Sequence, residues 1–104
     1  MNKATFKKRI KTAVREQESE AKVILFGSRA RNEARSDSDW DILVLLDRKD
    51  VTLKDEQKIR HLLFDIELET GESISTFVYS LNDWNTRLSV TPLYQNIQKE
   101  GVYL

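Results

Sequence analysis

Two short apolar runs most strongly constrain the fold of this 104-residue chain. Residues 23–26 are apolar throughout and stop at Gly27, and residues 40–46 are apolar except for Asp41. Continuous runs of this length, without polar alternation, are typical of strands that are buried on both faces. We therefore expect two buried strands of a sheet, joined by a polar connection of thirteen residues, 27–39.

The segments around these strands show mainly helical signals. Phe6, Ile10 and Val14 recur at helical spacing in the first helix, and Thr52 with Asp55 resembles a capping box. The expected helices cover residues 3–18, 29–33, 52–70, 80–88 and 91–100, a third strand covers 74–79, and residues 102–104 fold back onto the core. The sequence therefore predicts an α/β fold with a small mixed sheet of about three strands flanked by helices.

Length and composition narrow the class of protein further. A chain of 104 residues is expected to form a single domain, 1–104, because two cores would each be too small. The absence of cysteine excludes disulfides, thiolate metal sites and a cysteine nucleophile. No apolar run approaches the roughly 20 residues that cross a bilayer, and the basic start lacks the apolar core of a secretory signal. We expect a cytoplasmic protein without a membrane segment.

The charge is balanced overall but unevenly distributed. Lys and Arg number 17, as do Asp and Glu, which argues against broad attraction to nucleic acid. Residues 3–15 nevertheless contain six basic side chains and no acidic one. The solvated face of an amphipathic helix explains this run most simply. Direct binding of nucleic acid is not expected.

Asp39 and Asp41 form the first half of a candidate site. They lie two positions apart at the start of a predicted strand, so their side chains point to the same face, with Cα atoms roughly 6.6 Å apart. Carboxylate oxygens so placed can hold one or two hard cations, and Mg²⁺ suits them best because it takes few protein carboxylates together with phosphate oxygens. Taken alone, the pair also fits an exposed strand edge where aspartates cap turns.

Gly27 and Ser28 form the second half. A glycine that follows a buried strand lets backbone N–H groups approach a phosphate without a Cβ in the way, and a helix that begins there would add a favourable dipole. Taken alone, Gly-Ser also fits an ordinary strand-ending turn. The combination of a strand, Gly-Ser, a short helix, Ser-Asp-x-Asp and a second strand within a short segment favours a site for a nucleoside triphosphate.

The residues GSRAR at 27–31 and SDWDI at 38–42 resemble the signature of the nucleotidyltransferase superfamily related to DNA polymerase beta, and especially its minimal stand-alone members. The resemblance implies that Gly27 and Ser28 hold the triphosphate of ATP or another NTP. It also implies that Asp39 and Asp41 bind Mg²⁺, with two ions expected, for in-line attack of an acceptor hydroxyl on the α-phosphorus. The remaining candidate contacts to the nucleotide are Arg29, Arg31 and Ser38.

The third carboxylate of the family pattern is missing. Active relatives commonly have it on the next strand, where residues 73–76 contain no acid, and Glu72 is the nearest candidate. The resemblance therefore leaves two hypotheses open. One is an enzyme that transfers AMP from ATP to a hydroxyl of a protein or small molecule, as the antitoxin of a toxin-antitoxin pair with a HEPN-type helical partner, or as a homodimer. The other is a nucleotide-binding or interaction domain with weak or no catalysis.

Overall fold

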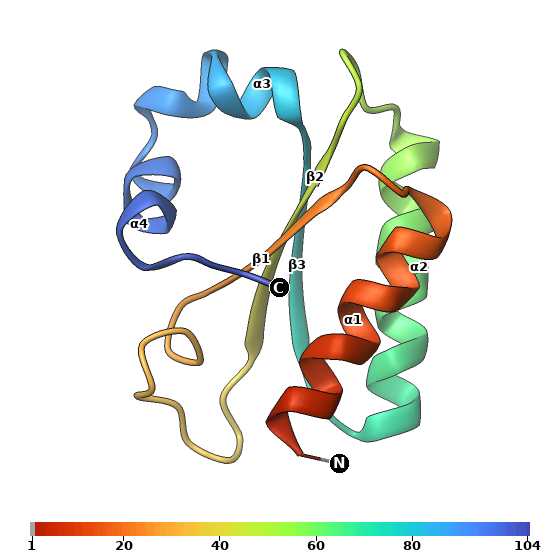
Figure 1. Cartoon of the computed structure of the whole chain (residues 1–104), viewed down its shortest axis with the longest axis vertical. Coiled ribbons are helices and arrows are strands. Elements are labelled where there is room, and N and C mark those ends of the chain that lie inside the picture. The colour runs from red at the N-terminus through yellow and green to blue at the C-terminus, as the bar shows by residue number, and fades with distance from the viewer. Residues whose placement is uncertain (1) are drawn as a thin grey trace.

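The computed structural model describes residues 2–104 and shows three layers (Figure 1). One face of a central sheet is covered by α1 (Lys3–Gln17) and α2 (Leu53–Thr70). The other face is covered by α3 (Leu81–Asn85), the 3-10 helix η1 (Arg87–Val90) and α4 (Pro92–Glu100). The predicted α/β class, with a small mixed sheet flanked by helices, is confirmed.

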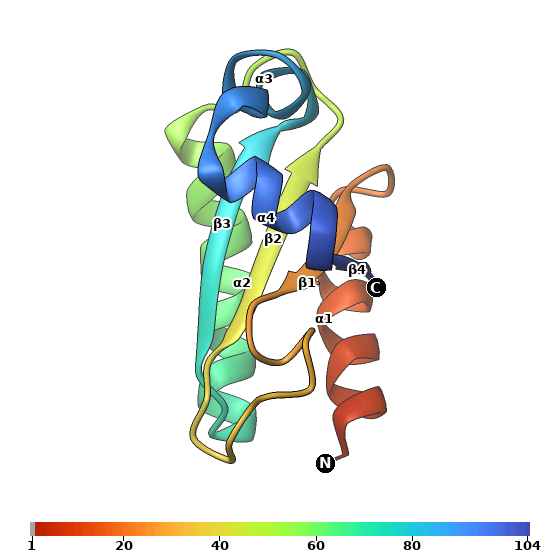
Figure 2. The same cartoon turned by 90° about the vertical axis from the view of Figure 1, so that its left-hand side faces the viewer.

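The sheet has four strands in the order β3-β2-β1-β4 (Figure 2). The central pair, β1 (Lys22–Phe26) and β2 (Trp40–Leu46), is antiparallel, and β3 (Ile74–Ser80) runs parallel to β2. The fourth strand, β4 (Val102–Tyr103), is two residues long and pairs with β1. The chain end therefore folds back as expected, and it adds one short strand to the three that the sequence predicts.

Alternate side chains of β2 enter two different cores. Ile42 and Val44 pack with the helices α1 and α2, whereas Leu43 and Leu45 pack with the cluster that includes Trp84 and Ile97 of the opposite layer. Burial on both faces explains why the run is apolar without alternation. Because side chains alternate along a strand, Asp41 belongs to the face of Leu43 and Leu45, the face that α3 and α4 cover further along.

Two predicted helical segments differ from the structure. Residues 29–33 form hydrogen-bonded turns and not a helix: the N–H groups of Ala30 and Arg31 both donate to the Gly27 carbonyl, and Asn32 has a left-handed φ of 57°. A left-handed residue this early stops helix propagation before a second turn can form. The helix expected to reach Leu88 ends instead at Asn85, because Thr86 leaves helical geometry at φ −118° and ψ −88°.

The helix-end signals of α2 are confirmed. Thr52 and Asp55 make both hydrogen bonds of the capping box, and Gly71 ends the helix in the left-handed conformation, at φ 77°. No helix in the described part of the chain combines the length and hydropathy needed to cross a bilayer.

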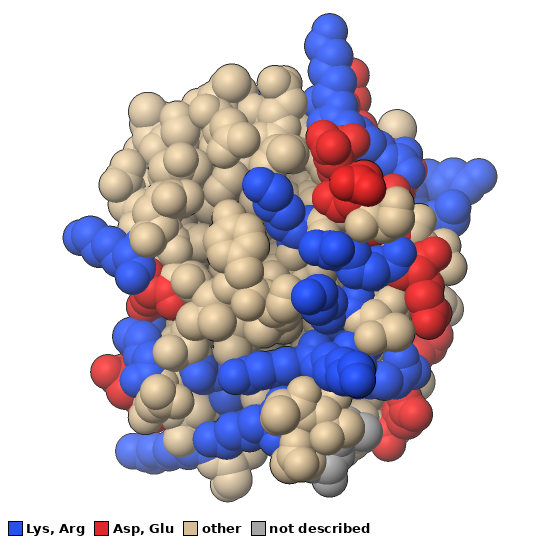
Figure 3. All heavy atoms as spheres, in the orientation of Figure 1, with Lys and Arg blue, Asp and Glu red and all other residues tan. Residues whose placement is uncertain are grey.

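The basic run of the sequence lies mainly on the outer side of α1. Phe6, Ile10, Ala13 and Val14 are buried, whereas Lys3, Lys8, Lys11 and Arg15 are exposed. Lys and Arg side chains gather over the lower half of the face shown in Figure 3. The interpretation as the solvent-facing side of an amphipathic helix agrees with this burial pattern.

Candidate active site

The candidate site lies at the end of the sheet where β1 stops and β2 begins, beside the connection formed by residues 27–39 (Figure 1). Phe26 pairs with Asp41 across the two strands, so the residue that follows Phe26 lies against the Asp41 side chain. Gly27 has a φ of 75°, and a Cβ added to it would lie 2.1 Å from Oδ2 of Asp41. Glycine is therefore required here by backbone conformation and by space.

Asp41 is the partly buried carboxylate of the site. Its pKa is raised above the ordinary value, first by burial, then by the neighbouring negative charge of Asp39 and, less, of Glu100, while Arg31 acts in the opposite direction. Asp39 is exposed, and its Oδ2 accepts a hydrogen bond from Oγ of Ser75 at 3.4 Å. Two acidic side chains thus share one end of the sheet in an environment that favours an added cation.

Asp39 and Asp41 fit a Mg²⁺ site whose remaining ligands come from the substrate and water better than they fit a site made of protein ligands alone. No cluster of three metal-binding side chains occurs among residues 2–104. Mg²⁺ is commonly held by one or two carboxylates together with substrate phosphates and water, which is the donor set that Asp39 and Asp41 can offer. Burial and the charge of Asp39 raise the pKa of Asp41 by more than Arg31 lowers it, so the nearby positive charge compensates this carboxylate only in part.

Arg31 and Glu100 lie beside the Gly27 turn. Nη1 of Arg31 donates to Oε2 of Glu100 at 2.8 Å, and the N–H of Gly27 donates to Oε1 of the same carboxylate at 3.2 Å. Glu100 is a site residue that the sequence motifs do not include. The feature of the sequence that could have singled it out is its place at the last position of a helix, just before Gly101. An acidic residue there is disfavoured by the helix dipole and needs another stabilising contact.

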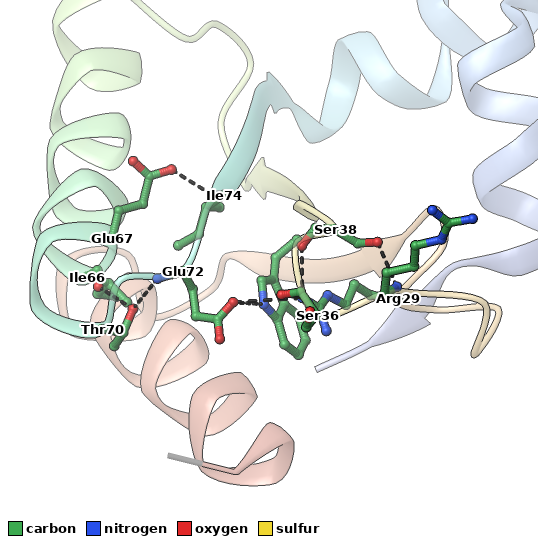
Figure 4. A network of polar contacts seen from close by, with 10 residues as sticks. Arg29, Ser36, Ser38, Ile66, Glu67, Thr70, Glu72 and Ile74 are labelled. Carbon is green, nitrogen blue, oxygen red and sulfur yellow. Dashed lines mark hydrogen bonds and ion pairs between the residues drawn. The ribbon is translucent and has the colours of Figure 1, made fainter.

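Arg29 points to the opposite side of the sheet. Its guanidinium lies 4.5 Å from the centre of the Trp40 ring and donates to the carbonyls of Ser38 at 2.8 Å and Ser36 at 3.4 Å (Figure 4). The side chain is only 7% exposed, and its Nε has no hydrogen-bond partner. Of the two arginines that the sequence leaves as candidates, Arg31 is near Asp41, while Arg29 holds the loop against Trp40.

The two candidate serines differ in their surroundings. Oγ of Ser38 accepts the N–H of Arg35 at 2.8 Å, and its carbonyl binds Arg29, so Ser38 shapes the loop. Ser28 is half-buried in the turn directly after Gly27, and its carbonyl accepts the N–H of Glu33. The structure thus brings Gly27, Ser28, Arg31, Asp39 and Asp41 to one end of the sheet, with Arg29 on the other face.

Glu72 does not lie with the two aspartates. Its Oε2 accepts the indole N–H of Trp40 at 3.1 Å and lies 3.7 Å from Nη2 of Arg29, and Trp40 points into the α1–α2 core (Figure 4). Because Trp40 and Asp41 are consecutive in a strand, they face opposite sides of the sheet. On β3 the residue in register with Asp41 is Ser75.

We expect Glu72→Gln to leave Mg²⁺-dependent ATP binding within about twofold, since a buried indole hydrogen bond and an ion pair are what the change weakens. The free energy of unfolding should fall by about 1 kcal/mol, the usual worth of such a polar contact. Isothermal titration calorimetry and urea denaturation measure the two quantities. A tenfold loss of ATP affinity at unchanged stability would contradict the placement of Glu72 outside the site.

The described residues thus form an α/β fold in which a glycine turn after a buried strand lies beside paired carboxylates at the start of the next strand. Comparison with protein families then matches residues 7–101 to the nucleotidyltransferase domain, and the chain belongs to this family. A crystal structure of a toxin-antitoxin with AMP-PNP has a chain with the same fold, with a TM-score of 0.67 and 18% identity over 92% of this chain and 69% of that one. Comparison with curated proteins found no significant match.

Proposed function

We propose that residues 1–104 act as a single Mg²⁺-dependent nucleotidyltransferase domain that moves AMP from ATP to a hydroxyl of a protein or small molecule. The observation that supports this most directly is the close approach of the Gly27 turn, the proposed phosphate-binding backbone, to Asp41, a carboxylate with a raised pKa. Membership of the nucleotidyltransferase family supports the same reaction class. A cytoplasmic location is part of the proposal.

Each residue of the site has a proposed role in binding the nucleotide or the metal. The backbone at Gly27 and Ser28 binds the triphosphate, and Arg31 balances its charge from the same side of the turn. Asp39 and Asp41 hold Mg²⁺, which supplies charge neutralisation on the phosphates and a lower pKa for the acceptor hydroxyl. The Ser75 hydroxyl keeps the exposed Asp39 side chain oriented through the 3.4 Å contact.

A second candidate function has a specific observation in its favour. On the site face of β3 the register positions are Ser75, Phe77 and Tyr79, none of them acidic, and Glu72 faces the other way. With no third carboxylate on β3 to deprotonate the acceptor, the domain would bind nucleotide with weak or no transfer. This second function uses the same nucleotide site as the first and differs from it only in the absence of efficient nucleotidyl transfer.

One assay separates the two functions. The protein is incubated with Mg²⁺ and α-labelled ATP, with and without the product of the neighbouring gene, beside an Asp39→Ala/Asp41→Ala variant. Label transfer that disappears in the variant supports the enzyme. Mg²⁺-dependent ATP binding without transfer supports the binding domain, and the absence of any nucleotide binding would overturn both.

The acceptor or partner needs a surface outside the nucleotide site. We infer that it is the outward stripe of α2, where Leu53 and Leu68 are each 70% exposed and Phe64 is 51% exposed, spaced as one helical face. The toxin-antitoxin nature of the structural match supports a partner protein as occupant. The proposed occupant is a helical protein of HEPN type, as the resemblance to minimal nucleotidyltransferases implies, and this chain would then be the antitoxin. Co-purification of the neighbouring gene's product with the wild-type chain, lost with Phe64→Glu, supports this. A homodimer in its place would contradict it.

A further inference from the structure

The carboxylate of Glu100 touches two donors of the Gly27 turn. Oε1 accepts the N–H of Gly27 at 3.2 Å, and Oε2 accepts Nη1 of Arg31 at 2.8 Å. A backbone N–H after a buried strand and a guanidinium are the two kinds of donor that bind phosphate oxygens in proteins. Glu100 therefore fills a small anion site with a side chain that comes from the last residue of α4.

The position of Glu100 within α4 is itself unfavourable for an acid. The C-terminal end of a helix is partially negative, so a carboxylate there is unfavourable unless it is compensated. The compensation comes from the turn: the Arg31 hydrogen bond lowers the pKa of Glu100 below its ordinary value against the effect of burial, and the Gly27 N–H adds to it. The same carboxylate adds to the negative charge that Asp41 experiences.

We propose that Glu100 is an internal substitute for a phosphate group, which holds the Gly27 N–H and Arg31 until the triphosphate displaces it, so that Glu100 sets the affinity for nucleotide. This inference rests on the proposed nucleotide site. When ATP binds, the carboxylate leaves both donors and moves into solvent, and a phosphate oxygen takes its place.

The backbone around Glu100 restricts this exchange to the side chain. The N–H of Gly101 donates to the carbonyl of Ile97 at 2.7 Å, and Val102 pairs with Leu25 in the sheet. A Cβ at Gly101 would lie 2.6 Å from the same Ile97 carbonyl, so the chain makes a close turn here. The Glu100 side chain is already 22% exposed, and rotation about its own bonds is enough to release both donors without unfolding β4.

The test compares Glu100→Gln with a matched control, Glu33→Gln. Both changes remove one negative charge next to Arg31, because Nε of Arg31 is 3.0 Å from Oε2 of Glu33, but only Glu100 also binds the Gly27 N–H. Calorimetry measures the affinity for ATP with Mg²⁺ and for tripolyphosphate, which has no base. We expect Glu100→Gln to tighten both by about tenfold, the loss of one charged competitor, and Glu33→Gln to change them by less than about twofold.

Other results overturn the proposal in identifiable ways. Equal affinities in wild type and Glu100→Gln mean that Glu100 only fastens α4, and weaker binding means that Glu100 belongs to the nucleotide-binding groups. Glu100→Asp, which keeps the charge on a shorter side chain, should give intermediate affinity, and thermal unfolding verifies that each variant is folded.

The failure of this inference is distinct from the failure of the proposed function. If the wild type binds ATP and Glu100→Gln binds it no better, the nucleotide site stands and the substitution role of Glu100 falls. If neither binds ATP or tripolyphosphate, both fall. Binding of ATP or tripolyphosphate that is detectable only in Glu100→Gln supports the proposal, because the wild-type carboxylate then excludes the phosphate group completely.

Discussion

Replacement of Asp41 by Asn is expected to lower nucleotidyl transfer by about 1,000-fold or more, since a metal site typically contributes several kcal/mol to the transition state. Asn keeps the size of the side chain and removes its charge, so the fold is preserved while the proposed Mg²⁺ site loses the more buried of its two carboxylates. Label transfer from α-labelled ATP measures the effect, and Mg²⁺-dependent ATP binding by calorimetry gives a second readout should transfer be slow in the wild type.

The same change should raise stability at neutral pH. A carboxyl whose pKa is raised on folding destabilises the folded state when it is ionised. This destabilisation is absent at pH values below the pKa in the unfolded state, about 3.9, and fully present above the pKa in the folded state. The Tm of Asp41→Asn is therefore expected to exceed that of the wild type at pH 7, with the difference shrinking as the pH falls below about 4.

Asp37→Asn is the matched control for Asp41→Asn. Asp37 is an exposed carboxylate of the same connection, so its replacement changes the net charge equally without touching the site. Equal losses of transfer in the two variants would show that Asp41 acts through general electrostatics and not as a ligand.

The second large effect is expected from Gly27→Ala. The added Cβ would lie 2.1 Å from Oδ2 of Asp41 at a residue with φ 75°, so the turn or the carboxylate must move. A shift of the phosphate turn by the width of a methyl group removes its N–H from the nucleotide, and ATP affinity should fall by about 100-fold, on the scale of losing two charged hydrogen bonds. The measurement is calorimetric titration with ATP and Mg²⁺.

Gly71→Ala separates the steric effect from backbone strain. Gly71 has nearly the same φ, 77°, but a Cβ there meets nothing within 4 Å. Both variants should lose stability through the left-handed conformation, by roughly 1–2 kcal/mol, and only Gly27→Ala should lose nucleotide. Retained ATP affinity in Gly27→Ala would contradict a phosphate site at this turn.

The prediction of the fold succeeded where local chemistry decides structure. The apolar runs at 23–26 and 40–46, the Thr52–Asp55 capping box and the left-handed Gly71 each depend on neighbours in sequence, and the structure confirms them. The expected helix at 29–33 was wrong, because the hydrogen bonds of that segment converge on the Gly27 carbonyl and Asn32 turns the chain.

For the site, the sequence by itself determined that a Gly-Ser turn follows one buried strand and that two aspartates share one face at the start of the next, because the order of elements and the spacing of two along a strand fix both. The tertiary structure decided the rest. It placed Glu72 and Arg29 on the α1–α2 side with Trp40, and it brought Glu100, 73 residues after Gly27, onto the Gly27 turn. Which of several similar charged side chains reaches a site depends on strand register and helix docking, and those are set by packing between segments far apart in the chain.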